Sequence, residues 1–277
     1  MEGLAVSVAR QAIVVPLYKE GLDSSEVQSI ERTLMLLGEH DIFLVGPQAL
    51  KPYFLMLSEK YGGRLKIQVF SDHFFKSVAG YNKLLMSEHF YAAFEAYQYL
   101  LIVQTDALVL KNELSYWCEK GYSYVGAPIF EGFTTPLQPL QVLCVGNGGF
   151  SLRKVADFLG VLRQPYFFRN KLMEHWPGNW LSSCYRYLKD YWCYSYKNTQ
   201  INVSVNEDIF WGLLVPARCK YFRVPLAHEA SRFAFDAEPE HLYLQNNRQL
   251  PFGCHAWERY DRSGWMRIFT EHQVEIK

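Results

Sequence analysis

The chain has 277 residues, and its 28 lysine and arginine side chains balance 28 aspartate and glutamate side chains. A chain without net charge lacks the basic field that binds nucleic acids and anionic membranes, so neither is an expected partner. Aromatic residues make up 16% of the chain. Besides building a core, such residues line carbohydrate and nucleotide sites, where apolar faces stack on rings.

The cysteines and the apolar runs bear on the cellular compartment. No run approaches the ~20 apolar residues of a membrane helix, and no signal peptide opens the chain. The six cysteines show neither a CxxC pair nor metal-type spacing, which favours reduced thiols. We therefore expect a cytoplasmic protein without a transmembrane segment, and leave open a peripheral position at the inner membrane face.

Residues 1–110 alternate between short apolar runs and amphipathic segments. We expect four strands and three helices there: strands at 12–15, 41–45, 65–70 and 100–103, and helices from Asp23 or Ser24 to Gly38, up to about Lys60, and from Ser77 to Tyr97. Strands joined by helices favour parallel right-handed crossovers, hence a Rossmann-like α/β sheet. No GxGxxG follows the first strand, which argues against a dinucleotide cofactor.

The segment YLLIVQTDALVL, residues 99–110, carries the most information. Leu100 to Val103 has the wholly apolar pattern of a central parallel strand. Asp106 follows it and precedes a second apolar run, and ligands bind at the carboxyl ends of strands in open α/β sheets. Asp106 is therefore a site candidate; the alternative is an aspartate that only caps the next turn.

Residues 111–277 are less regular. Tyr122 to Val125 predicts a strand, and the loop Ile129 to Gln141 is a candidate mobile lid. Phe150 to Leu152 predicts another strand, after which Arg153, to which we assign no catalytic role, begins a helix. The aromatic-rich insert 164–200 can form an acceptor platform, or can be the core of a helical subdomain. With no repeat or linker, residues 1–277 are parsed as one domain.

Three motifs, in order, resemble those of GT-A glycosyltransferases: QTD at 104–106, GNGGFSLR at 146–153 and NEDIFW at 206–211. PFGCHAWE at 251–258 completes the set. The chain looks like a member of a bacterial-type family of such enzymes long catalogued only as a domain of unknown function. The resemblance implies a nucleotide-binding half, 1–110, and an acceptor half, 111–277. It also implies sugar transfer from a nucleotide-sugar donor to a glycan or lipid-linked acceptor in surface polysaccharide synthesis.

The leaving diphosphate requires neutralisation of its charge. GT-A enzymes commonly use a DxD motif and a divalent metal, and here the first carboxylate is replaced by Gln104. The resemblance implies Mn²⁺ or Mg²⁺ bound by Asp106 and His255, with phosphates and water completing the shell. A structural imidazole at His255 and a metal-free variant remain open. Lys83 can offset phosphate charge instead, or can be a solvated helix residue.

Other positions are candidates for donor binding. Gly148 and Gly149, after Asn147, let the backbone approach a bulky ligand, although a tight turn would require glycine equally. The remaining donor-site candidates lie near strand ends, where Tyr18 can stack on the base and Asp72 can accept a hydrogen bond from it. They are Pro16, Leu17, Tyr18, Asp72 and Thr105.

Transfer with inversion needs one base for the acceptor hydroxyl. Glu207-Asp208 resembles the ED pair of inverting GT-A enzymes, which implies Asp208 as the base and Glu207 as an acceptor-binding or orienting residue. Acidic residues are also ordinary in a first helical turn. The alternative functions are a non-catalytic nucleotide-sugar or glycan-binding protein and a sugar-nucleotide pyrophosphorylase. The pyrophosphorylase lacks support because no glycine-rich phosphate loop follows the first strand.

Overall fold

The computed structural model describes residues 10–164 and 206–276. Its strands are β1 Gln11–Pro16, β2 Asp41–Pro47, β3 Leu65–Phe70, β4 Tyr99–Val103, β5 Ala107–Val109, β6 Tyr124–Val125, β7 Pro128–Phe130, β8 Val142–Val145, β9 Phe150–Lys154, β10 Ala234–Phe235 and β11 Gly253–His255. Its helices are α1 Ser24–Leu37, η1 Gln48–Leu50, α2 Lys51–Lys60, η2 Asp72–Phe75, α3 Val78–Leu85, α4 Glu88–Ala92, α5 Leu114–Glu119, α6 Val155–Leu162, α8 Glu207–Ile209, the π-helix η3 Phe210–Leu214, α9 Ala227–Phe233, α10 Pro239–Gln245 and α11 Arg262–Glu271.

The central sheet has the order β3-β2-β1-β4-β9-β6. The first four strands are parallel, β9 is antiparallel to β4, and β6 is antiparallel to β9. The order 3-2-1-4 is that of a Rossmann half. The predicted α/β class with a mostly parallel Rossmann-like sheet is therefore confirmed.

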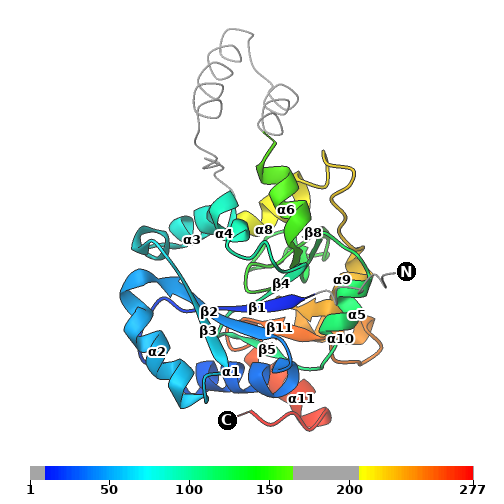
Figure 1. Cartoon of the computed structure of the whole chain (residues 1–277). Helices are drawn as coiled ribbons and strands as arrows, with labels where there is room; N and C mark the ends of the chain where they lie inside the picture. The colour runs from blue at the N-terminus through cyan, green and yellow to red at the C-terminus, as the bar shows by residue number, and fades with distance from the viewer. Residues whose placement is uncertain (1–9, 165–205, 277) are drawn as a thin grey trace, which may run out of the picture.

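Both faces of this sheet are buried, which explains its wholly apolar strands. In β1, Ile13 and Val15 pack in one core cluster, whereas Ala12 and Val14 pack in a second cluster on the other face. Figure 1 shows α1 and α2 covering one face, with α3, α4 and α6 beyond the other. Helices therefore cover both faces of the sheet.

Helix α1 begins as the sequence predicts. The Asp23 carboxylate accepts a hydrogen bond from the Glu26 N–H at 2.9 Å, and the Glu26 carboxylate accepts one from the Asp23 N–H at 3.0 Å. This reciprocal capping box satisfies donors at the helix start. The buried face of α1, with Ile30, Leu34 and Leu37, then packs against the sheet.

Two predicted helix boundaries are wrong. The single helix 77–97 is instead α3 and α4, because the Ser87 hydroxyl accepts a hydrogen bond from the Phe90 N–H at 3.2 Å and so starts a second helix. Arg153 does not begin a helix either. It lies in β9, paired with Leu100 of β4, and α6 starts at Val155.

A small second sheet, β10-β11-β5, extends from the end of β4. β11 is antiparallel to β5, with His255 opposite Ala107. This register brings a residue near the end of the chain beside Asp106. β7 and β8 form a separate hairpin, and the loop between them includes most of the predicted lid.

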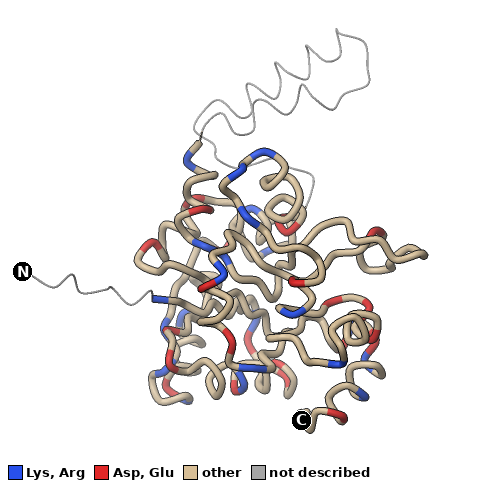
Figure 2. The backbone as a smooth tube through the Cα atoms, turned by 90° about the vertical axis from the view of Figure 1, so that its right-hand side faces the viewer, with Lys and Arg blue, Asp and Glu red and all other residues tan. Residues whose placement is uncertain are grey.

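The structure also bears on the expected membrane segments, cysteines and charge. No helix among the described residues is long and apolar enough to cross a membrane. The four cysteines within the described ranges are buried free thiols. Except for Gln164, the insert 164–200 lies outside the described residues. Figure 2 shows basic and acidic residues interspersed along the described backbone, in keeping with the absence of net charge.

Candidate active site

Asp106 and His255 meet where β4 passes into β5. The Ala256 N–H donates to the Asp106 carbonyl oxygen at 3.0 Å, which extends the β5–β11 pairing by one bond. His255 Nε2 consequently lies 3.4 Å from Asp106 Oδ1. The side chain of Asp106 is 54% exposed, whereas that of His255 is 17% exposed. The two motifs therefore come together as expected, and a metal at the pair stays a prediction.

Asp236, which the sequence did not single out, holds the other face of the imidazole. It directly follows β10, and its Oδ1 lies 3.3 Å from His255 Nδ1. Burial acts to lower the pKa of His255, but Asp236 and Asp106 outweigh it and raise that pKa to about 10. Burial acts to raise the pKa of Asp106, yet contact with His255 holds it below its usual value. The imidazole is therefore held between two carboxylates, which favour its protonated form.

Asn147 ties the glycine segment to this group. Its Oδ1 accepts hydrogen bonds from the N–H groups of Gly149 at 2.6 Å and Phe150 at 2.9 Å, while its Nδ2 donates to Asp236 Oδ2 at 2.8 Å. The Gln104 N–H donates to the Gly149 carbonyl oxygen at 2.7 Å, which joins the segment to the end of β4. Asn147 is thus fully engaged as a positioning residue within the protein.

The two glycines are required by close approach. A Cβ on Gly149 would collide with the His255 ring, and a Cβ on Gly148 would lie 3.0 Å from Glu207 Oε1. Neither residue has a positive φ. The glycines therefore make room for the side chains of His255 and Glu207, and the alternative of a turn that needs positive φ does not apply.

We expect Gly149→Ala to displace His255 and to lower the melting temperature, because overpacking of a filled site costs about 1–3 kcal/mol. Differential scanning fluorimetry and the NMR shifts of the His255 ring would measure both effects. Gly160→Ala in α6 is the matched control, since alanine favours a helix and the tip of Tyr221 can move aside. An unchanged His255 environment in Gly149→Ala would contradict this packing.

Glu207 forms a buried ion pair with Arg153. Arg153 Nη2 lies 2.8 Å from Glu207 Oε1, and the side chains are 0% and 2% exposed. Arg153 Nη1 also donates to the Tyr91 hydroxyl at 2.9 Å. Burial raises the pKa of Glu207 to about 7, although Arg153 acts against it. Sequence reasoning missed this role of Arg153, because it placed the residue on a helix.

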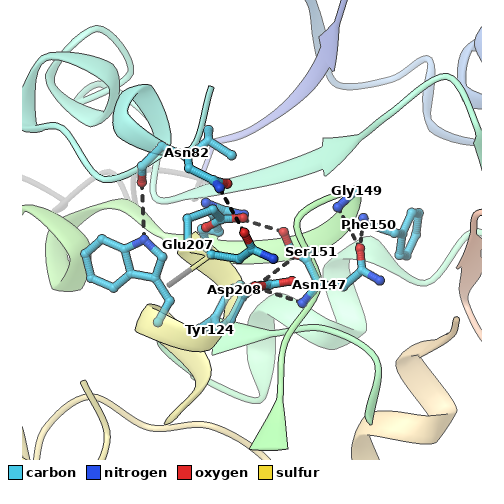
Figure 3. Close-up of polar contacts among 12 residues, drawn as sticks. Asn82, Tyr124, Asn147, Gly149, Phe150, Ser151, Glu207 and Asp208 are labelled. Carbon is cyan, nitrogen blue, oxygen red and sulfur yellow. Dashed lines mark hydrogen bonds and ion pairs between the residues drawn. The ribbon is translucent and has the colours of Figure 1, made fainter. Parts of the chain in front are cut away.

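Asp208 is partly exposed beside Glu207. Its Oδ1 accepts a hydrogen bond from the Ile209 N–H at 2.7 Å, and no other hydrogen bond or ion pair to its carboxylate exists among the described residues. Burial raises its pKa above the usual value. Figure 3 shows Glu207 and Asp208 beside the segment that carries Asn147. Within the described part of the chain, Asp208 thus keeps one carboxylate oxygen without a partner.

Three of these carboxylates act on the pKa of Tyr260. Burial raises the pKa of Tyr260 first, and the negative charges of Asp236, Asp106 and Asp208 raise it further. Asp106 and Asp208 are 102 positions apart in the sequence, and both raise the pKa of Tyr260.

As far as the structure describes the chain, the remaining predicted donor-site residues form no hydrogen bond with the Asp106–His255 pair. Leu17 is buried, and its N–H donates to the Val45 carbonyl oxygen at 2.8 Å, while Tyr18 is 67% exposed. Thr105 Oγ1 donates to Glu26 Oε1 at 3.1 Å, so its hydroxyl serves the α1 cap. No hydrogen bond or ion pair among the described residues links the following five to Asp106 or His255: Pro16, Leu17, Tyr18, Asp72 and Lys83.

For Asp72 and Lys83 the structural alternatives to donor binding stay open. Asp72 is exposed, and its Oδ1 accepts a hydrogen bond from the Ala49 N–H at 3.1 Å, a structural role at the start of η1. Lys83 is exposed on α3, as a solvated helix residue would be. Asn206 occupies the N-cap position of α8, but its side chain accepts a hydrogen bond from Asn82 rather than capping the helix.

The β7–β8 hairpin lies next to Asp208. Ile129 and Cys144 pack with Ile209 in one small cluster, so the hairpin borders the start of α8. The position of the predicted lid, residues 129–141, agrees with this packing. Its mobility stays a prediction.

A divalent cation fits the Asp106–His255 pair. Among the described residues no three His, Cys, Asp or Glu side chains form a complete metal cluster. The separation of 3.4 Å is close to the ~3 Å between neighbouring ligands of an octahedral cation with bonds of about 2.1 Å. Asp236 would orient the ring from its other nitrogen, the usual carboxylate–histidine arrangement. The protein would supply two ligands, and the rest would be phosphate and water oxygens.

The chain is similar to several solved structures. One is TarS 1–349 of S. aureus in complex with UDP, at 14% identity and a TM-score of 0.32, covering 53% of this chain and 47% of that one. Another is mouse xyloside xylosyltransferase 1 in its apo form, at 7% identity and a TM-score of 0.49, covering 89% and 97%. A third is GlyE of Streptococcus pneumoniae TIGR4, at 11% identity and a TM-score of 0.44, covering 97% of this chain and 65% of that one.

The chain thus spans about half the length of the TarS chain it matches. No curated protein matches it. A family model does match, over residues 64–255, which is more than half of the chain. The chain therefore belongs to the family described as "Protein of unknown function (DUF5672)", which confirms the family resemblance of its motifs.

Proposed function

We propose that this protein is an inverting GT-A glycosyltransferase that moves a sugar from a nucleotide-sugar donor to a hydroxyl of a glycan or lipid-linked acceptor in surface polysaccharide synthesis. One observation carries the proposal. Segments 104–106, 147–149, 206–208 and the residue His255 gather around the carboxyl end of β4, where open α/β sheets bind ligands.

The donor diphosphate would bind at Asp106 and His255. In the bound state a Mn²⁺ or Mg²⁺ ion held by these side chains would neutralise charge on the leaving diphosphate. His255 would exchange its Nε2 proton for the ion, since metal ligation requires a neutral imidazole. Asp236 and Asn147 keep the ring and the glycine segment in register through their hydrogen bonds.

The acceptor hydroxyl would be deprotonated by Asp208. As the acceptor oxygen bonds to the anomeric carbon, its proton passes to the free oxygen of Asp208, and the bond to the diphosphate breaks with its electron pair. A raised pKa makes a carboxylate a stronger base, which suits Asp208 to this role. Glu207, one residue earlier and fixed by Arg153, would orient substrate rather than take the proton.

The nucleoside would lie at the ends of β1 and β3. The exposed ring of Tyr18 offers a stacking face just after β1. Asp72 follows β3 and has an oxygen not engaged by Ala49. The resemblance of the motifs to GT-A enzymes supports this placement.

Ligand screening tests the proposal most directly. Thermal-shift measurements would compare UDP-glucose, UDP-N-acetylglucosamine, GDP-mannose and dTDP-glucose, each with and without Mn²⁺. Stabilisation by one donor followed by transfer to a glycan would support a glycosyltransferase. Stabilisation without transfer to any acceptor or to water would favour a non-catalytic binding protein instead.

We expect His255→Gln and Asp106→Asn each to remove any Mn²⁺ dependence and to weaken donor affinity ~10–100-fold, the usual cost of impairing a metal site. Isothermal titration of the selected donor with and without Mn²⁺ would measure this. His228→Gln, an exposed histidine on α9, is the matched control. Full Mn²⁺ dependence in both variants would place the ion elsewhere.

A further inference from the structure

Two buried polar atoms near the start of α8 have no hydrogen-bond partner among the residues that the structure describes. They are the hydroxyl oxygen of Tyr81, on α3, and Oε2 of Glu207. An unpaired buried polar group costs about 1–3 kcal/mol, so two of them in one region require an explanation. Neither atom is satisfied by the ion pair, because Arg153 engages only Glu207 Oε1.

The two atoms belong to one region of the molecule. The Asn82 side chain donates to Asn206 Oδ1 at 3.2 Å, so neighbours of Tyr81 and Glu207 are directly bonded. Figure 3 shows Asn82 reaching toward the start of α8. Helix α3 and the start of α8 therefore meet at this point.

The Tyr81 hydroxyl also lies close to the end of β4. Burial raises the pKa of Tyr81, Arg153 lowers it, and Glu207 and Asp106 raise it further. The Gln104 side chain is near enough to lower this pKa, although the hydroxyl has no partner within hydrogen-bond geometry. The hydroxyl therefore lies in the common field of the ion pair and the Asp106 group.

The charges of this region select the chemistry of what binds there. Arg153 disfavours a cation, and Glu207 disfavours an anion such as phosphate. A neutral group remains. Tyr81 has a hydroxyl hydrogen to donate, and Oε2 of the ionised Glu207 carboxylate is an acceptor. A carbohydrate hydroxyl satisfies both at once, because its single oxygen accepts one hydrogen bond and donates another.

We propose that Tyr81 and Glu207 form a subsite that binds one hydroxyl of the transferred sugar, with Tyr81 donating to it and Glu207 accepting from it. This inference rests on the proposed function. Gly148 lies against the same carboxylate, where a Cβ would approach Oε1 to 3.0 Å, so the glycine segment borders the subsite. The Gln104 side chain, two residues before Asp106, acts on the Tyr81 hydroxyl, so the subsite would lie beside the proposed diphosphate site.

A substrate-specific affinity difference tests the subsite. Isothermal titration would compare each of UDP-glucose, UDP-N-acetylglucosamine, GDP-mannose and dTDP-glucose with its own bare nucleoside diphosphate, in the wild type and in Tyr81→Phe. We expect the variant to lose at least ~10-fold of the affinity that the sugar adds, and nothing of the affinity for the diphosphate. A site that pairs a hydroxyl discriminates strongly when one partner is missing.

The variant should fold, because it removes a hydroxyl that lacks a partner, and its melting temperature should be unchanged or higher. Tyr97→Phe is the matched control. The Tyr97 hydroxyl donates to Asp41 at 2.6 Å at the amino edge of the sheet, the edge opposite the site. Equal losses for sugar nucleotide and diphosphate, or no loss for either, would overturn the subsite while leaving the donor site intact. If the wild type binds none of these ligands, the proposed function fails, and the subsite with it.

Discussion

Asp208→Asn should leave the protein folded and able to bind donor, while kcat for transfer falls by about 10²–10⁴, the usual contribution of a general base. The amide has the size of the carboxylate and keeps an oxygen for the Ile209 N–H. It cannot take up the proton of the acceptor. Steady-state kinetics, with donor affinity measured separately by titration, would show kcat falling at unchanged donor binding.

Asp261→Asn is the matched control for this substitution. Asp261 caps α11 by accepting a hydrogen bond from the Gly264 N–H at 3.0 Å, and asparagine caps a helix equally well. Near-wild-type transfer by Asp208→Asn would move the base elsewhere, with Glu207 next. Retention at the anomeric carbon, read by NMR of the product, would exclude the inverting mechanism.

Arg153→Met should lower the free energy of unfolding by about 3–5 kcal/mol, because it leaves the Glu207 carboxylate buried without its partner. Chemical denaturation would measure the loss. Arg153→Met with Glu207→Gln should recover much of it, since no charge then remains buried. Arg163→Met, which breaks exposed pairs with Glu88 and Glu95, should change the melting temperature little.

The destabilisation caused by Arg153→Met should be larger at alkaline pH than at acidic pH. The pKa of Glu207 in the folded protein is about 7, above its ordinary value of 4.5, so the folded state binds this proton more tightly than the unfolded state. The resulting stabilisation is fully present below about pH 4.5 and is lost as the pH rises through 7. Arg153 acts against this rise, so its removal should raise the pKa of Glu207 further. The variant should therefore continue to lose stability at a higher pH than the wild type. An equal destabilisation at about pH 5 and about pH 8, on either side of this pKa, would contradict a buried, ionisable Glu207.

The sequence predicts the parallel half of the sheet well, because a strand buried on both faces must be apolar throughout. The β4 segment Tyr99–Val103 is such a strand, and its pattern alone places Asp106 at a carboxyl end. The helix 77–97 fails for the opposite reason. Its apolar periodicity continues across Ser87, where one side-chain hydrogen bond ends the continuity.

The site is predictable only in part. Motif order suggests that Asp106 and His255 meet, but the contact itself depends on β11 pairing with β5. Asp236 and Tyr81 belong to no motif, and their roles arise from tertiary neighbours. A single polar residue after a two-residue strand, as in β10, carries almost no local signal.

The Arg153–Glu207 pair also bears on which changes in the sequence would move Asp208. The pair joins residues 54 positions apart, one before and one after residues 165–205. Since the Asn82–Asn206 bond fixes Asn206 as well, the placement of Asp208 depends on residues outside that range. We therefore expect changes confined to residues 165–205 to leave the position of Asp208, the proposed base, unchanged.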